Sequence, residues 1–160
     1  MRALLLTLLA CASLGSVTSA AEPPPTAIEV RAFMAHLEDA SRARDLDRIA
    51  AALAADCRIE LRATIEGHEQ VTLMTRSEYV AMLTTGFAAL KSLEEYHYRV
   101  TGLTVALDTD PPGATVESQV QESFVLGGRP FATDSHEIAR VERRAGELKL
   151  VAVSSESVGR

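Results

Sequence analysis

Two glutamates in the second half of the chain carry the clearest chemical signal. Glu122 and Glu137 each lie in a segment where apolar and polar residues alternate, which is typical of a β-strand with one buried face. In each segment the glutamate shares its phase with apolar residues and with a serine, Ser118 or Ser135. Side chains of one phase point to one side of a strand, so the sequence predicts two carboxyl groups facing a common interior. Buried carboxylates that face each other repel, and one of them would hold a proton near neutral pH.

A carboxyl group of this kind can act as a general acid or base, which makes Glu137 the candidate catalytic residue. The same group can instead belong to a structural network with serine and threonine neighbours, and this alternative stays open. Tyrosine hydroxyls such as that of Tyr98 could also reach the interior. The candidate ligand-binding residues are Ser118, Glu122, Ser135, Glu137, Tyr79 and His36.

Other catalytic signatures are not found in the sequence. The histidines have no ligand spacing such as i, i+4 on one helix, so no metal site is predicted. There is no glycine-rich phosphate loop, nucleophile elbow or dinucleotide fingerprint, and we expect no cofactor. Cys57 is in phase with Ile59 and Leu61, so we interpret it as a small core residue rather than a nucleophile.

Helical patterns dominate the first part of the mature chain. From Ala27 to Ser41 the apolar residues recur at helical spacing, and Leu46–Leu53 predicts a short second helix with Asp45 as its N-cap. A third helix is predicted to open at Ser77, with Tyr79 on its apolar side.

Strand patterns fill the remainder. The period changes to two at Cys57, which predicts a strand to Ile65, a turn at residues 66–69 and a return strand at 71–74. Four further strands joined by tight turns predict an antiparallel meander, with strands at 96–107, 114–126, 129–144 and 148–155. Its outer face would carry polar residues such as Glu117, His136 and Arg140, continued by Val151 and Val153.

The chain begins with the pattern of a secretory signal. A positive start, an uninterrupted apolar run from Ala3 to Leu9 and small residues ending at Ala20 predict a signal peptide at residues 1–20. The apolar run is too short for a membrane span, so we expect a periplasmic or secreted protein. The segment ending in Cys11 also resembles a lipoprotein box, and acylation there would anchor the chain to a membrane. A proline-rich leader, residues 21–26, is predicted to be extended and mobile.

Composition narrows the range of partners. The chain has 160 residues, is 47% hydrophobic and has a net charge of −6, and loss of Arg2 with the signal makes it more acidic. An acidic domain without a basic cluster is a poor candidate for binding nucleic acid or anionic lipid. Cys57 would be alone after cleavage, so no internal disulfide is expected.

The order of these elements predicts an α+β domain, residues 27–157, in which three N-terminal helices pack on a curved antiparallel sheet. Such a sheet coils into a cone with an open pocket. The chain resembles the nuclear transport factor 2-like superfamily over about residues 27–155, in particular its SnoaL-like and ketosteroid-isomerase-like branches. The resemblance is carried by the motifs Arg44–Ile49, Ala54–Glu60, Arg76–Tyr79 and Gly127–Arg129.

The resemblance also allows the isomerase chemistry to be compared position by position. The catalytic carboxylate of the first strand matches Leu61, and the phenol of the first helix matches Leu37. A protonated acid on the penultimate strand matches Glu137. Two aliphatic residues at three positions argue against ketosteroid-type isomerisation.

Three functions remain open at this point, because this fold hosts many. The first is an exported domain that binds a small, mostly apolar molecule in the cone. The second is a SnoaL-like enzyme (isomerase, dehydratase, cyclase or hydrolase) that uses Glu137 as acid or base. The third is an accessory domain that binds a partner through the outer sheet face. The resemblance also implies a homodimer. The sequence does not identify the ligand, a reaction, the oligomeric state or a pathway.

Overall fold

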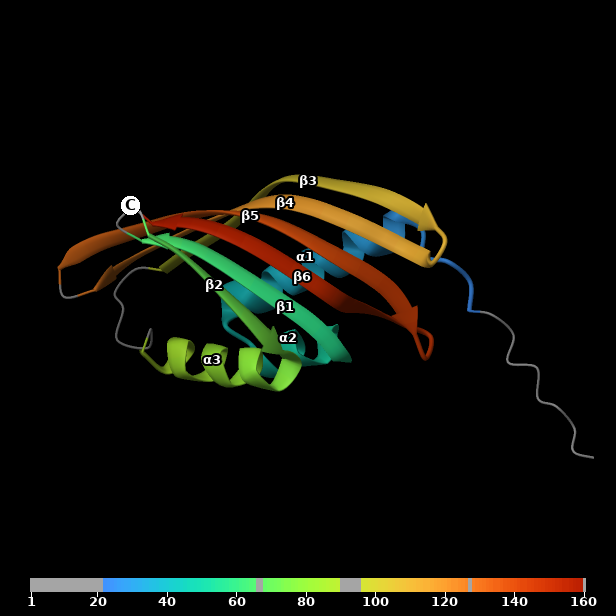
Figure 1. Ribbon diagram of the computed structural model, residues 1–160, viewed down its shortest axis with the longest axis horizontal. Helices are drawn as coiled ribbons and strands as arrows, with labels where there is room; N and C mark the ends of the chain where they lie inside the picture. Colours follow the sequence, from blue (N-terminus) through green and yellow to red (C-terminus); the bar gives the residue numbers. More distant parts are fainter. Residues whose placement is uncertain (1–21, 66–67, 90–95, 127, 160) are drawn as a thin grey trace, which may run out of the picture.

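The computed structural model describes residues 22–65, 68–89, 96–126 and 128–159 (Figure 1). The predicted signal peptide, the turn at 66–67 and Gly127 of the predicted glycine turn lie outside these residues. Within them the helices are α1 (Ala27–Ala43), α2 (Leu46–Ala52) and α3 (Arg76–Ala89). The strands are β1 (Leu53–Ile65), β2 (His68–Thr75), β3 (Tyr96–Thr109), β4 (Pro112–Leu126), β5 (Arg129–Arg144) and β6 (Glu147–Gly159).

The strands form one sheet in the order β2-β1-β6-β5-β4-β3. The meander from β3 to β6 is antiparallel as predicted, and β1 pairs antiparallel with β2. The expectation of a wholly antiparallel sheet is wrong, because β1 runs parallel to β6. The third helix follows the first hairpin, as its predicted start at Ser77 requires, so two helices and not three precede the sheet. The fold is therefore α+β with a mixed sheet.

The helices lie on the concave side of the curved sheet, where α1 crosses behind the strands in Figure 1. Helix α1 packs against β3 and α2, and α3 packs against β1 and β2. Thr26 begins α1 with a capping box, in which its hydroxyl accepts from the Glu29 amide and the Glu29 carboxylate accepts from the Thr26 amide. Arg44, at φ 54°, ends α1, and Asp45 caps α2 as predicted by accepting from the Arg48 amide.

The solid part of the core lies between α1 and the centre of the sheet. Val30, Ile59, Val116 and Val141 are its largest fully buried side chains. Cys57 is buried beside them, in agreement with its interpretation as a core residue. This cluster closes one end of the space between the helices and the sheet.

A bulge in the pairing of β5 with β6 changes the phase of β6. Val141 pairs with Leu150 and Arg140 pairs with Ala152, so Val151 is an extra residue on β6. Beyond the bulge, Val153 pairs with Ala139 and faces the interior with it. The prediction that Val153 continues the outer face is wrong for this reason.

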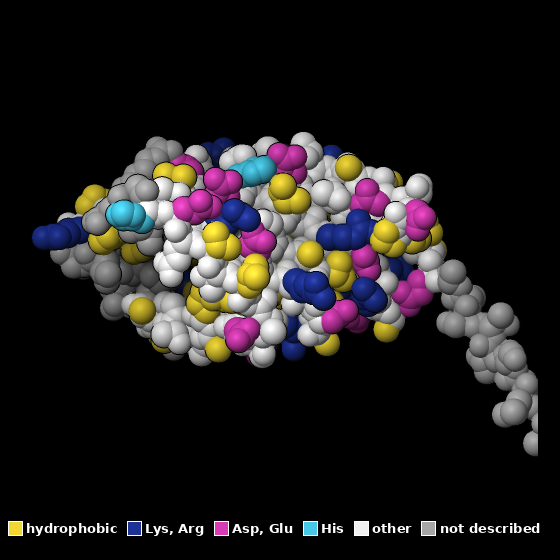
Figure 2. All heavy atoms as spheres, in the orientation of Figure 1, with side chains coloured by type: hydrophobic (Ala, Val, Ile, Leu, Met, Phe, Trp, Pro, Cys, Tyr) yellow, Lys and Arg dark blue, Asp and Glu magenta, His cyan; other side chains and the backbone are white. Residues whose placement is uncertain are grey.

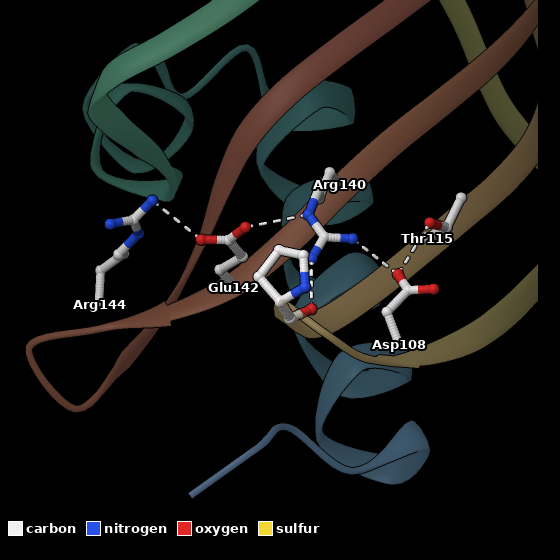
Figure 3. A network of polar contacts seen from close by, with 6 residues as sticks. Asp108, Thr115, Arg140, Glu142 and Arg144 are labelled. Carbon is white, nitrogen blue, oxygen red and sulfur yellow. Dashed lines mark hydrogen bonds and ion pairs between the residues drawn. The ribbon is translucent and has the colours of Figure 1, made fainter. Parts of the chain in front are cut away.

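Arg140 lies on β5 beside the bulge and links this strand to the end of β3 and the β3–β4 turn (Figure 3). Its guanidinium donates to Asp108 at 2.7 Å, to the carbonyl of Pro111 at 2.7 Å and to Glu142 at 2.9 Å. Thr115 donates to the same Asp108 oxygen at 3.0 Å. The planar guanidinium with its several donors suits this branched contact better than an ammonium would.

The proline-rich leader is tied to the domain where the structure describes it. The Glu22 carboxylate accepts from the Gly146 amide at 2.8 Å, and Arg143 donates to the Pro23 carbonyl at 3.1 Å. Arg143 also pairs with Glu29 at 2.8 Å. These contacts join Glu22 and Pro23 of the leader to the β5–β6 turn and to the end of β5.

Candidate functional site

A cavity of about 340 Å³ lies between the helices and the sheet, beyond the solid core. Helices α1 and α3 and strands β3 to β6 supply most of its wall. Much of that wall is apolar, from residues such as Leu37, Leu61, Leu83, Phe87 and Val120. Its volume lies at the lower end of the range for small-molecule sites.

The two glutamates singled out in the sequence both line this cavity, from neighbouring strands. Glu137 on β5 lies opposite Ser118 on β4, and Glu122 lies opposite Thr133. Because Ser118 and Glu122 are four residues apart on β4, the backbone positions of the two glutamates differ by about 13 Å along the sheet. They therefore share a cavity without forming a close carboxylate pair.

Glu137 is partly buried on the cavity wall, and its loss of hydration raises its pKa above the ordinary glutamate value of 4.5. Ser155 opposes the shift by donating to the carboxylate, at 3.5 Å, which is a long hydrogen bond. The negative charge of Glu122 raises the pKa further and is the smallest of the three causes. The neutral acid form of Glu137 thus persists to higher pH than in an exposed glutamate.

All three tyrosines of the chain line the cavity. Burial is the largest cause that raises the pKa of each phenol, followed by the charge of Glu137 for Tyr79 and Tyr98 and of Glu122 for Tyr96. Tyr96 donates to the Glu122 carboxylate, and Tyr98 is hydrogen-bonded to Ser41. The three phenols therefore stay protonated at neutral pH and can donate hydrogen bonds.

Tyr79 differs from the other two tyrosines. Its ring fills part of the cavity wall, yet its hydroxyl makes no hydrogen bond with any residue that the structure describes. The negative charges of Glu137 and Glu122 both raise the pKa of this hydroxyl. No buried side-chain oxygen or nitrogen of the described residues lacks a partner, so this hydroxyl is open to the cavity, where it can bond to water or a ligand.

Serine hydroxyls complete the polar part of the wall. Ser135 and Ser157 bond to each other at 2.7 Å, and Ser118 and Ser155 are buried. Each can donate and accept, so the wall can adapt to more than one polar group.

The structure brings five of the six predicted ligand-binding residues to this cavity. The exception is His36, which is exposed and lines a shallow hollow on the other side of α1 with Arg48 and Glu147. His36 borders the apolar face of the helix, and sequence periodicity does not separate a border residue from the face itself.

Sequence reasoning missed Tyr96, Ser41, Ser155 and Ser157 as wall residues. The serines on β6 follow one another at strand spacing, a signal that the bulge at Val151 concealed. Leu37 and Leu61, the aliphatic matches to the isomerase positions, also line the cavity. The wall thus has aliphatic groups where that branch carries a phenol and a carboxylate.

Among the described residues no group of histidine, cysteine, aspartate and glutamate side chains could hold a metal ion. None of the helices in the described ranges has the length and apolar character needed to cross a bilayer.

Comparison with known proteins gives structural likeness alone. Neither protein-family models nor curated proteins match the chain. An NTF2-like protein of Cytophaga hutchinsonii aligns with a TM-score of 0.60 and 12% identity, covering 80% of this chain and 94% of its own. Two proteins of Novosphingobium aromaticivorans align with TM-scores of 0.63. One is provisionally named a scytalone dehydratase (12% identity; 81% and 82% covered), the other an aromatic ring hydroxylase (16%; 83% and 92%).

These alignments extend over most of each chain, and several of the similar structures are named NTF2-like. The chain therefore has the NTF2-like superfamily fold. At such low sequence identity the structural similarity establishes the fold but not the function, which has to be inferred from the residues of the cavity.

Proposed function

We propose that this domain binds a small, mostly apolar molecule in the cavity between its helices and sheet. The observation that carries the proposal is the cavity itself, about 340 Å³ with an apolar wall and a few polar groups. Sites for small molecules have this composition, since the apolar surface supplies affinity and the polar groups fix the orientation.

The polar groups that would orient the ligand are Ser118, Glu122, Ser135 and Glu137, with the hydroxyl of Tyr79. Ser155 already donates to the Glu137 carboxylate, and no buried polar side-chain atom of the described residues lacks a partner. Carboxyl and hydroxyl oxygens have more than one bonding position, so these groups can also bond to a molecule that enters the cavity.

A neutral fluorescent probe, N-phenyl-naphthylamine, tests the proposal. We expect saturable binding, and Leu83→Trp, which fills the cavity from α3, should weaken it by at least about tenfold. Ile28→Trp is the matched control, because Ile28 is 81% exposed at the start of α1. Binding that does not saturate, or that Leu83→Trp leaves unchanged, would refute the proposal.

Native mass spectrometry of protein purified from its own source gives the complementary measurement. A ligand that stays bound would appear as a discrete added mass, and the same spectrum would count the subunits. A homodimer is expected by resemblance. Its pairing surface would be the outer sheet face, where Leu73 and Ile138 are exposed among charged groups (Figure 2).

An acid–base enzyme is the second candidate, favoured by the raised pKa of Glu137 on the cavity wall. Solved structures with similar folds include proteins provisionally named a dehydratase and a hydroxylase. If this chain is an enzyme, Glu137→Gln abolishes turnover while folding is retained. If it is a binder alone, Glu137→Gln changes affinity and no turnover is found in either form.

The proposed place of action is the periplasm or the exterior, after removal of residues 1–20. Amino-terminal sequencing of the exported protein tests this, with Ala21 as the expected first residue. Recovery in the membrane fraction with a lipid on Cys11 would instead support the anchored form.

A further inference from the structure

We propose that the ligand is a cation, an apolar molecule that carries one amino group. The inference rests on the proposed function and adds the charge of the molecule that the cavity selects. It is argued from the charges and hydrogen-bonding groups that face the cavity.

The charged side chains of the wall are all acidic. Of the described residues that line the cavity, Glu38, Glu122 and Glu137 are carboxylates, and none is a lysine, arginine or histidine. Glu38 is already neutralised by Arg42, at 2.6 Å. Neither Glu122 nor Glu137 forms an ion pair with a side chain in the described part of the chain.

An anionic ligand is disfavoured in such a cavity, because the described residues of its lining offer carboxylates and no lysine, arginine or histidine side chain. Like charges that approach each other in a partly buried setting repel more strongly than they do in water. A cationic ligand gains the corresponding attraction, and its desolvation is offset by the carboxylate that it meets.

The remaining polar groups suit an ammonium, which has three N–H donors and no acceptor. The Tyr79 oxygen lacks a partner in the described residues, Ser118 is buried opposite Glu137, and both can accept. The tyrosine rings add a second attraction, because the face of an aromatic ring attracts a cation. Near Tyr96 the chain already uses this contact, with the Arg44 guanidinium 4.5 Å from the ring centroid.

The titratable groups that face the cavity decide how its charge responds to a ligand. They lie on α1, α3, β3, β4 and β5, and β6 contributes serines instead. The titratable groups are Glu38, Tyr79, Tyr96, Tyr98, Glu122 and Glu137. The phenols remain neutral, and burial favours the protonated form of Glu137. An ammonium that meets the protonated acid takes the place of that proton, so the carboxylic acid and the ammonium ion give an ion pair and a released proton.

Three naphthalene probes of similar size separate the charge from the apolar part: naphthylethylamine, naphthylethanol and naphthylacetate. The protein expressed from its full coding sequence is titrated calorimetrically at about pH 7, in phosphate and in Tris. We expect the amine to bind at least about tenfold more tightly than the alcohol, and the acetate more weakly than the alcohol. The difference in heat between the buffers should show proton release with the amine and none with the alcohol.

Glu137→Gln then assigns the effect to this carboxyl. It should reduce the preference for the amine over the alcohol to below about threefold and abolish any proton release with the amine. Glu156→Gln, at an exposed position on β6, is the matched control and should change neither quantity. The proton count on the unaltered protein stands independently of how the variant folds.

The outcomes also separate this inference from the proposed function. If the alcohol binds as tightly as the amine, the cationic ligand is refuted and a binding cavity remains. If none of the three probes binds and N-phenyl-naphthylamine also fails, the proposed function itself is refuted.

Discussion

Glu137→Gln should make the protein more stable at neutral and alkaline pH while leaving its stability near pH 4.5 almost unchanged. The carboxyl is buried without a cation among the described side chains, and its pKa is raised above 4.5 in the folded state. The folded protein therefore holds this proton more tightly than the unfolded chain does. The stability that this proton provides is complete below the unfolded pKa and is lost as the pH rises toward the folded pKa.

The size of the effect follows from linkage. At pH values between the unfolded and the folded pKa, the folded state binds one proton more than the unfolded chain. The free energy of unfolding of the wild type therefore falls by about 1.4 kcal/mol for each unit by which the pH rises. Glutamine fills the same volume and does not ionise, so the variant should not show this loss. The substitution alters the hydrogen bond that Ser155 donates to Glu137. This bond is long, 3.5 Å, so its loss should lower the free energy of unfolding only slightly.

The assay is urea unfolding of wild type and variant at intervals from pH 4.5 to about pH 9, since the tyrosines do not ionise in this range. Glu156→Gln, exposed on β6, controls for the loss of one negative charge from the whole molecule. The expected result is a difference that grows with pH in favour of Glu137→Gln and then levels off. A constant difference, or one that grows in favour of wild type, would contradict the burial argument.

Four further predictions concern the residues around the cavity. A methyl group on Gly113 would lie 2.9 Å from the carbonyl oxygen of Val141, so Gly113→Ala should lower the unfolding free energy by about 1–3 kcal/mol. Gly86→Ala, which meets nothing within 4 Å, should raise it by about 0.5–1 kcal/mol, as urea unfolding would show. The Cys57 thiol is buried with its pKa raised to about 11, so an aromatic disulfide reagent should modify it only after unfolding. Arg140→Lys keeps the charge but loses most of the branched contact, and we expect a loss of about 1–2 kcal/mol in the same unfolding assay.

Local patterns in the sequence predicted most of the elements correctly. The first helix, the Asp45 cap and the meander all depend on neighbours within a few residues, and such signals are legible in a single chain. The parallel contact of β1 with β6 joins residues almost a hundred positions apart, as between Leu53 and Leu150. Nothing in the alternation of either strand specifies which edge the first hairpin will join, so this part of the topology was not predicted.

The wall of the cavity was predictable where strands are regular and was missed where they are not. Uninterrupted alternation placed Glu122 and Glu137 on one side, as the structure has them. An extra residue at Val151 reversed the phase of β6, which hid the serines at 155 and 157. A bulge of this kind is set by pairing with the neighbouring strand and leaves little trace in composition.

Strand β4 shows how one element serves both stability and the site. Its inward residues run Val116, Ser118, Val120, Glu122, so the strand starts in the solid aliphatic core and continues into the cavity wall. An inward face selected for stability alone would remain aliphatic, because each buried polar group weakens the core unless it is satisfied. The opposite strand repeats the change from Val141 and Ala139 to polar groups. The change from aliphatic to polar groups at the same depth on two neighbouring strands agrees with the proposed binding role, since packing alone would favour aliphatic groups on both.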